Sequence, residues 1–425
     1  MSSRVGRAVV SLVLVGGAFA VGQAGGAAAA PSDWMDPVTL APVGAEDVHA
    51  VVADSGDMAV VWEHAGAIEA AVRPSDGDWA APVTVAAAHG DFPLAAFDAT
   101  GRLLVVWTKA VAGDPVRLMS RAMDDTGVWA SAVVVAHRAD GAIRADDLAV
   151  DTSGDAVVGW LWGNRALVSS GSIGGGWSAP VAWSKTLSVD VALGDGGHAA
   201  AMLQRWVGPR SEEITLTFEV ARRSPAGVWG ATRVLQTVEQ SPPWVGPGGV
   251  AVDAAGVTTV AWQRVGPDGT QVVAVRARPS RAYGAPTVLA DQPTPTEWGV
   301  RVLATPGGDV LVTWVHNFVA NVRAAHRPAA GPWEAARTVC RGDGVVMDWD
   351  VSLADGGRAL VAVSKAAHFK AAYGTQTCFM SKAGRWAAPT QVTAAVDGPR
   401  VGLSDSDGLV AWLAGPGLRA RATEG

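Results

Sequence analysis

Cysteine, tyrosine and charged residues are scarce in this sequence of 425 residues, which has two Cys, two Tyr and 17% charged residues. An average globular chain has about a quarter charged residues. The net charge is −7, and Lys and Arg form no runs. Such a chain has no electrostatic footprint for nucleic acid and no polybasic segment for an anionic bilayer. We therefore exclude nucleic acid as a partner, and we expect no membrane span because no apolar run after residue 30 is long enough.

Motifs of the common enzyme and metal-binding classes are also missing. The sequence has no His-Glu-x-x-His, no closely spaced cysteine pair, no Gly-x-Ser-x-Gly, no Walker A and no dinucleotide fingerprint. Its eight histidines are scattered. The Asp-rich turns could suggest calcium, but hairpin geometry alone explains Asp-x-x-Gly between apolar strands. We therefore expect no metal and no cofactor.

The first thirty residues have the composition of a secretory signal peptide. Arg4 and Arg7 form a basic start, an apolar stretch covers residues 8–21, and small residues at 25–30 form a cleavage zone. Two arginines and no acids leave with residues 1–30, so the formal charge moves from −7 to −9. We expect a secreted, extracellular protein with one domain at residues 31–425.

What the sequence has in abundance is tryptophan, and its nineteen copies are arranged in a repeat. One phrase, Gly-x-Trp followed by small residues and often Pro, recurs with gaps of 45, 50, 48, 52, 54, 50 and 53 residues. A second phrase alternates with it: a turn with Asp and Gly, then an apolar run ending in Trp, with weaker copies through Met202 and Val363. A period near fifty indicates a solenoid, propeller or array. The first-phrase anchors are Trp34, Trp79, Trp129, Trp177, Trp229, Tyr283, Trp333 and Trp386, and the second-phrase anchors are Trp62, Trp107, Trp160, Trp262, Trp314 and Trp412.

Each repeat is predicted to contain four strands. In the unit 92–135, strands are expected at 92–97, 103–107, 116–123 and 128–135, separated by Asp- and Gly-containing turns. Pro stands three residues after the first-phrase anchor in five copies. Because proline cannot donate to a ladder, the fourth strand should lie at the outer edge. Four antiparallel strands with the last one outermost describe a propeller blade.

The ends of the chain favour a closed ring. The last unit has three strands and lacks a fourth, whereas residues 34–40 form a fourth strand without the first three. If residues 34–40 complete the last blade, no raw sheet edge remains. The prediction is an all-β propeller of eight four-stranded blades. Seven blades is the alternative, if the divergent unit around 188–235 is a distorted insertion.

The two cysteines, Cys340 and Cys378, lie in adjoining repeats. In an exported protein such a pair is more often a disulfide than two free thiols. We predict a disulfide that ties neighbouring units together. The alternative is two buried thiols that act as small apolar residues.

At these motifs the chain resembles secreted bacterial β-propellers of the sialidase-like, Asp-box (BNR) superfold, and also fucose-lectin-type propellers. In both, a Trp opens the fourth strand after a Gly-containing turn. The Asp-box pattern has Gly three residues before Trp, whereas here it stands two before, and Asp at the expected offset is sporadic, as at Asp124. The resemblance covers residues 34–425 and implies the fold class, not an activity. The glycines concerned are Gly77, Gly127, Gly227, Gly331 and Gly384.

The resemblance allows a direct test for sialidase activity, whose machinery includes an arginine triad, a Tyr–Glu nucleophile pair and an Arg-Ile-Pro motif. The sequence has no Arg-Ile-Pro. Tyr283 occupies an anchor position, and Tyr373 has no nearby Glu in sequence. A sialidase is therefore disfavoured. A glycosidase with two carboxylates across a pocket stays open, because that geometry is spatial and not sequential.

Six tryptophans are not required by the repeat. Trp183 is expected to pack at the rim, and the other five fall in loops between strands two and three or between blades, which emerge on one face. Exposed aromatic rings gathered on one face would form a binding patch; the alternative is that each caps the sheet beneath it. The candidate ligand-binding residues are Trp162, Trp206, Trp244, Trp298 and Trp349, with Asn164, Arg165, Arg205, Glu297 and Asp348 as polar neighbours.

These observations favour an exported, monomeric and non-catalytic propeller that binds a glycan or another extracellular ligand through its loop face. One alternative is a propeller glycoside hydrolase or lyase, which carboxylate pairs at the channel mouth would favour. Another is a cell-surface protein–protein scaffold, which a broad apolar face would favour.

Overall fold

The computed structural model describes residues 34–423 apart from 140, 208–213, 242–244, 267–268, 293–295, 297–298, 317–320, 341–344, 368–370, 394–396 and 415–416. These residues form strands and turns and no helix, so no helix long enough to cross a membrane occurs among them. The predicted signal peptide, residues 1–30, lies outside the described part.

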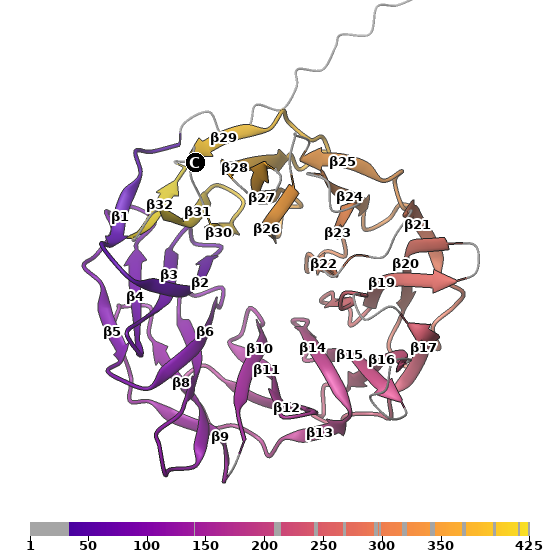
Figure 1. Ribbon diagram of the computed structural model, residues 1–425, viewed down its shortest axis with the longest axis horizontal. Helices are drawn as coiled ribbons and strands as arrows, with labels where there is room; N and C mark the ends of the chain where they lie inside the picture. Colours follow the sequence, from indigo (N-terminus) through magenta and orange to yellow (C-terminus); the bar gives the residue numbers. More distant parts are fainter. Residues whose placement is uncertain are drawn as a thin grey trace, which may run out of the picture.

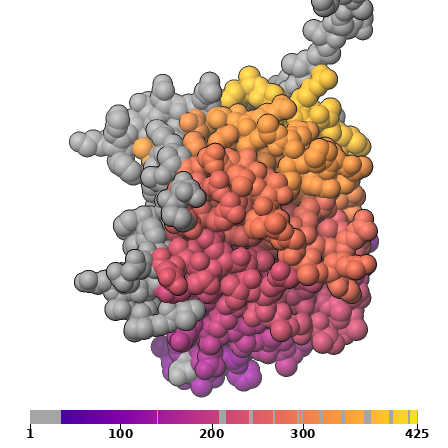
Figure 2. Space-filling view, turned by 90° about the vertical axis from the view of Figure 1, so that its right-hand side faces the viewer, coloured from indigo at the N-terminus to yellow at the C-terminus, as the bar shows by residue number. Residues whose placement is uncertain are grey.

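The strands form eight four-stranded antiparallel sheets arranged as blades around a central axis (Figure 1). The all-β, eight-bladed propeller is therefore confirmed, and the unit around 188–235 is a complete blade rather than an insertion. In the side view, successive blades follow one another around the ring in sequence order (Figure 2). In chain order, blades 1 to 8 are β2–β5 (Ala45–Val52, Met58–His64, Ala67–Arg73, Val83–Ala86), β6–β9 (Gly90–Phe97, Leu103–Lys109, Val116–Met123, Val133–Arg138), β10–β13 (Ile143–Val150, Asp155–Trp162, Arg165–Ser172, Val181–Ser184), β14–β17 (Thr186–Leu193, Ala199–Val207, Ile214–Arg223, Arg233–Ser241), β18–β21 (Gly249–Val252, Thr258–Gly266, Gly269–Ala277, Thr287–Gln292), β22–β25 (Val300–Ala304, Val310–His316, Asn321–Arg327, Arg337–Cys340), β26–β29 (Val345–Leu353, Ala359–Ala367, Ala371–Met380, Thr390–Thr393), and β30–β32 (Asp397–Leu403, Gly408–Ala414, Gly417–Ala422) with β1 (Val38–Ala41).

The N-terminal strand closes the ring, as predicted. β1 pairs antiparallel with β32, where Val38 lies opposite Ala420 and Thr39 opposite Arg419. Arg421 extends the seam by donating from Nε to the Met35 carbonyl at 2.7 Å. A sheet edge that would otherwise be open to another chain is thereby covered.

The fourth strands begin later than predicted. Each starts four residues after its first-phrase anchor, so the strand expected at 128–135 runs over Val133–Arg138. Five of the anchors make only an isolated bridge, as Trp129 does to Met123. Proline then falls just before the strand, where no N–H is needed for the ladder. These anchors are half-buried, except for the buried Tyr283, and are not the fully buried core residues that the repeat predicts.

The second-phrase tryptophans, in contrast, are buried between blades with at most 2% of their surface exposed. Each packs on the preceding blade, as Trp160 does in a cluster with Val106. In blade 4 the residue at the same distance from the turn is Leu203, which packs toward blade 3, so the assignment of Met202 to this position is wrong by one residue. A shift of one residue in a strand reverses the face that a side chain covers.

Blade 7 has Val363 at the second-phrase position, and Trp349 fills the space beside it. Trp349 lies directly opposite Val363 across β26 and β27 and is 1% exposed in the core between blades 6 and 7. The same core contains the predicted disulfide, because Cys340 at the end of β25 and Cys378 in β28 are bonded. The bond confirms that neighbouring units are tied together.

Candidate functional site

The first strand of each blade faces the axis, and the channel that they surround has two mouths (Figure 1). Turns between strands one and two surround one mouth, which we call the turn-side mouth. Connections between strands two and three, and those between blades, surround the other, the loop-side mouth. The two mouths carry different chemistry.

At the turn-side mouth, the first residue of the turn is an Asp with a structural role in three blades. Asp98 Oδ1 accepts hydrogen bonds from the backbone N–H groups of Thr100 and Arg102. Asp151 does the same for its own turn, and Asp253 accepts from Val257. Carboxylates that satisfy their own turn in this way explain the Asp-x-x-Gly motif without a ligand.

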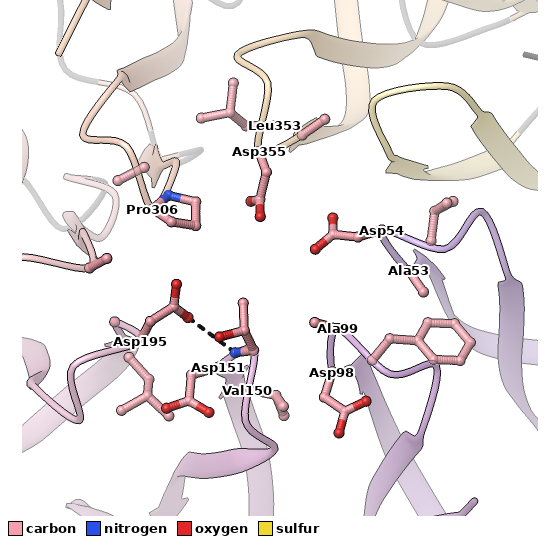
Figure 3. A pocket seen from close by; sticks show the side chains of 18 of the residues that line it. Ala53, Asp54, Asp98, Ala99, Val150, Asp151, Asp195, Pro306, Leu353 and Asp355 are labelled. Carbon is pink, nitrogen blue, oxygen red and sulfur yellow. Dashed lines mark hydrogen bonds between the residues drawn. The ribbon is translucent and has the colours of Figure 1, made fainter. Parts of the chain in front are cut away.

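The second residue of each turn lies nearer the axis, and four blades have Asp there: Asp54, Asp195, Asp355 and Asp405. These four residues stand one position after the first residue of the turn, so Asp54 and Asp405 are not equivalent to Asp98 and Asp151. Asp54, Asp195 and Asp355 point into a cavity of about 250 Å³ at the mouth (Figure 3). Asp405 accepts from the Gly356 N–H at 2.6 Å.

Electrostatic repulsion accumulates at this mouth. Burial, followed by the charges of Asp54 and Asp195, raises the pKa of Asp355 to about 6. The pKa of Asp54 is also raised, chiefly by burial. Like charges that meet at partly buried positions disfavour ionisation. Among the described residues, no group of three or more His, Cys, Asp or Glu side chains is arranged to hold a metal ion.

Further into the channel, one residue per blade stands four positions before its turn. We call this set the waist ring: His49, Leu94, Asp147, Asp190, Gly249, Arg301, Asp350 and Arg400. Arg301 of blade 6 acts electrostatically on His49, Asp147 and Asp190, which belong to three other blades. The ring therefore surrounds a shared space and is rich in charge of both signs.

The aspartates of the waist ring join blades. Asp147 Oδ2 accepts from the Val191 N–H of the next blade at 2.7 Å, and Asp190 Oδ2 accepts from Val250 at 2.7 Å. Asp350 makes the same bond to Val401 at 3.0 Å. These N–H groups belong to innermost strands, which have no ladder partner on the channel side. Each carboxylate thus satisfies a backbone donor that would otherwise be unpaired.

Burial in the ring shifts the protonation of its members. It raises the pKa of Asp147 to about 6 and that of Asp190 well above its ordinary value. The charge of Asp146 further raises the pKa of Asp147, and the Asp147 carboxyl further raises the pKa of Asp190. Burial lowers the pKa of His49 to about 4, with Arg400 and Arg301 acting in the same direction. At neutral pH, His49 is therefore uncharged.

Two arginines balance the carboxylates on the opposite side. Arg301 lies 3.3 Å from Asp350 and stacks over the Trp349 ring at 5.2 Å. Arg400 donates to Asp348 Oδ2 at 2.8 Å. Asp348, a predicted binding residue, is therefore engaged in an ion pair on the channel wall. The sequence analysis did not identify the ring, although a spacing of four residues before each turn would have revealed it.

At the loop-side mouth, six of the eight innermost strands have a register irregularity near their start. In blade 1 it includes Asp47 with φ of 44°. Asp47 also contacts Asp91 of blade 2, whose pKa is raised chiefly by burial and then by this contact. Bulges of this kind re-aim side chains and are frequent beside binding sites.

The structure places only some of the predicted binding residues in loops. Trp162 ends β11, whereas Trp206 lies in β15 and Trp349 in β26, with 6% and 1% exposure. The expectation that Trp162, Trp206 and Trp349 are loop residues is therefore wrong, because all three lie in strands. Arg205 is paired with Glu219 at 2.7 Å. Trp244, Glu297 and Trp298 lie outside the described residues.

Trp162 is half-buried at the loop side of blade 3, with Asn164 and Arg165 exposed beside it. The guanidinium of Arg138, from the end of β9, lies 4.9 Å from the ring centroid, and that of Arg165 lies 5.5 Å from it. Arg138 was not identified from sequence, because it belongs to blade 2 and only the fold brings it to Trp162. We call Trp162, Arg138, Asn164 and Arg165 the blade 3 patch.

No family model matches this sequence, and no curated protein is significantly similar to it. Solved structures with similar folds include a protein of unknown function from Dyadobacter fermentans DSM 18053, at 12% identity over 90% of this chain and 99% of that one, with a TM-score of 0.45. The polysaccharide lyase Uly1 has 9% identity over 91% and 90%, with a TM-score of 0.48. The Hadza microbial sialidase Hz136 has 10% identity over 86% and 76%, with a TM-score of 0.39. At these identities, the similarity does not bear on activity.

Proposed function

We propose that this is an exported propeller that binds an acidic glycan without cleaving it, through the loop side of the ring. The single observation that carries the proposal is the blade 3 patch, in which a half-buried indole has two guanidinium groups over it at 4.9 and 5.5 Å. The net charge of the chain is −7, so positive charge gathered around an aromatic ring is a local feature.

The chemistry of the patch suits a sugar acid. Sugar rings stack on aromatic faces through their C–H groups, and Trp offers the largest face. Arginine presents paired N–H donors that match a carboxylate or sulfate group. Asn164 adds an amide that can both donate and accept. Stacking fixes the sugar ring, while the arginines select for its charge.

The test is binding of uronate-containing and sulfated oligosaccharides on a glycan array, followed by calorimetry on the best ligand. We expect Trp162→Ala to weaken binding about fivefold or more, taking as a guide the contribution of about 1–3 kcal/mol that a nucleic-acid base makes when it stacks on an aromatic side chain. The double variant Arg138→Gln/Arg165→Gln should lose the preference for acidic over neutral glycans. The melting temperature should change little in both.

Arg121→Gln is the matched control, since Arg121 also stacks over an indole, that of Trp129 at 5.5 Å. It should leave binding unchanged. The proposal is wrong if the wild-type protein binds no acidic glycan, or if Arg121→Gln weakens binding as much as the patch variants.

A second candidate, carbohydrate cleavage by a hydrolase or lyase, is favoured by one observation, the pKa of about 6 at Asp147 in the channel. A carboxyl that is partly protonated near neutral pH can serve as a general acid. However, Asp147 and Asp190 contact each other, whereas glycosidase carboxyls stand about 5 Å or more apart. Release of reducing or unsaturated ends from a polysaccharide panel, lost in Asp147→Asn, would establish cleavage and replace the binding proposal.

A further inference from the structure

A cavity of about 370 Å³ lies between blades 4 and 5, on the turn side of the ring and separate from the channel. Three arginines line it: Arg222 and Arg223 at the end of β16 and Arg233 at the start of β17. His198, Thr258 and Tyr283 contribute the other large polar groups. No Asp or Glu is among the lining residues. We call it the arginine groove.

The three arginines are held by backbone carbonyls and not by carboxylates. Arg222 donates to the carbonyls of Arg278 and Arg281 at 3.0 and 2.8 Å. Arg223 donates to the Gly197 carbonyl at 3.1 Å, and Arg233 to the Tyr283 carbonyl at 3.3 Å. Neutral acceptors fix the guanidinium groups in place, and among the described residues no carboxylate forms an ion pair with Arg222 or Arg233. Asp155 and Arg223 line a neighbouring cavity together. Each guanidinium has five N–H donors, so donors remain for a ligand.

Two corresponding grooves elsewhere in the ring contain at least one acidic residue that compensates an arginine. Between blades 8 and 1, Arg73 shares its groove with Asp76, Asp78 and Asp407. Between blades 5 and 6, Arg276 lies 3.5 Å from Asp253, although Arg278 and Arg327 line the same groove. The same architecture therefore places acidic residues beside arginines in these two grooves and omits them in the arginine groove. The omission is a property of this pair of blades and not of the fold.

Tyr283 gives the groove a second distinctive feature. The anchor at this position is Trp in the other seven blades, and only blade 5 has Tyr. The Tyr283 hydroxyl is buried beside Thr258, whose side chain contacts it. Arg222 and Arg233 lie 5.1 and 5.8 Å from its ring. Burial raises the pKa of Tyr283 to about 12, so the hydroxyl keeps its proton and can donate.

We propose that the arginine groove binds an oxyanion, a phosphate, sulfate or carboxylate group, carried by a small organic molecule. Arginine forks pair with two oxygens of such a group, and the Tyr283 hydroxyl supplies a further donor. A water molecule occupies about 30 Å³ in the liquid, so the cavity has room for about twelve, which exceeds one inorganic ion. Val220 and Val228 provide apolar surface for the carrier.

The experiment is calorimetric titration of the mature protein with inorganic phosphate, inorganic sulfate and glucuronate at constant ionic strength, with chloride and glucose as references. We expect saturable binding of at least one oxyanion and none of glucose. Preference for phosphate or sulfate would identify a tetrahedral group, and preference for glucuronate a carboxylate. Binding no tighter than that of chloride by all three would overturn the proposal.

Variants separate this site from general electrostatic attraction. Arg233→Gln and Tyr283→Phe should each weaken binding about tenfold, as expected when one donor to a charged group is lost. Tyr283→Trp restores the residue found in the other blades, so the blade should fold normally while the hydroxyl is lost, and binding should weaken as well. Arg276→Gln, in the compensated groove, should bind like wild type. Equal affinity in Arg233→Gln, Tyr283→Trp and wild type would refute the assignment.

Discussion

The pKa values of two waist-ring residues are shifted in opposite directions, and the consequence for stability can be measured. The pKa of Asp147 is raised from 3.8 to about 6, and that of His49 is lowered from 6.5 to about 4. One pKa unit corresponds to about 1.4 kcal/mol, so each shift is equivalent to about 3 kcal/mol. Both side chains lie at the same level of the channel wall.

The sign follows from proton binding. Between about pH 4 and 6, native Asp147 holds a proton that the unfolded chain has released, so its contribution is fully present at low pH and is lost as the pH rises through 6. Over the same range, native His49 is neutral while the unfolded chain is protonated. Its contribution is present above pH 6.5 and is lost as the pH falls through 4. In the wild-type protein, the effects of Asp147 and His49 on the pH dependence of the unfolding free energy therefore largely cancel.

Asp147→Asn removes the decrease in stability with rising pH that Asp147 causes, so the increase that His49 causes can be measured. The Asn oxygen can still accept from the Val191 N–H, and its amide can donate to Asp190. We expect this variant to be more stable than wild type at pH 7 by up to about 3 kcal/mol, with little difference at pH 4. His49→Gln should become less stable as the pH rises from 4 to 6.

Urea unfolding followed by tryptophan fluorescence, at half-unit steps from pH 4 to 7.5, measures both. A stability difference between Asp147→Asn and wild type that stays constant over this range would show that Asp147 does not titrate there, and the account of the ring would be wrong.

The remaining predictions concern the seam, the disulfide and the core. Deleting residues 31–41 removes β1 and bares β32, so we expect aggregation or loss of a cooperative melt; a truncated protein that melts like its parent would contradict the closure seen at Arg421 and Met35. Neither Cys340 nor Cys378 should react with an alkylating agent until the protein is reduced, and the bond, across a separation of 38 residues, should contribute about 3–4 kcal/mol in the loop-entropy model; labelling of both thiols without reductant would exclude it. Trp349→Ala should cost about 3–5 kcal/mol, as much as Trp314→Ala, because both rings are buried between blades; a neutral Trp349→Ala, measured by chemical denaturation, would show that Val363 and its neighbours fill the space unaided.

The repeat made the fold predictable. Fifty-residue spacing, the Asp- and Gly-containing turns and the orphan strand at residues 34–40 together require blades in a closed ring, since each observation constrains the same backbone hydrogen bonds. The errors were of one to five residues. The strand expected at 128–135 starts at Val133. Periodicity places a blade well but does not decide whether a ladder begins at an anchor or after the proline that follows it.

The site was less predictable, because it depends on neighbours from different blades. Arg138 and Trp162 are 24 positions apart in different blades, and no local pattern links them. Trp349 was predicted to be a ligand-binding residue because the repeat does not require a tryptophan at its position. It is buried because Val363, on the adjacent strand, is smaller than the tryptophan of other blades. A large side chain on one strand can fill the space left by a smaller one on its neighbour, and this depends on side-chain volumes that a repeat pattern does not describe.

The seam between β1 and β32 has a consequence for the order of assembly. Its hydrogen bond from Arg421 to Met35 joins residues 386 positions apart, so the cost in chain entropy of forming it early is high, whereas pairing within one blade spans only adjacent strands. Blades should therefore form first, and the ring should be sealed last. Until residues 417–422 have emerged and folded, β1 has no partner, and the first and last blades of the growing arc each expose an apolar face. A chain that stalls before this point can aggregate through its unpaired strand and exposed apolar surface. Rapid completion of the last blade therefore limits aggregation during folding.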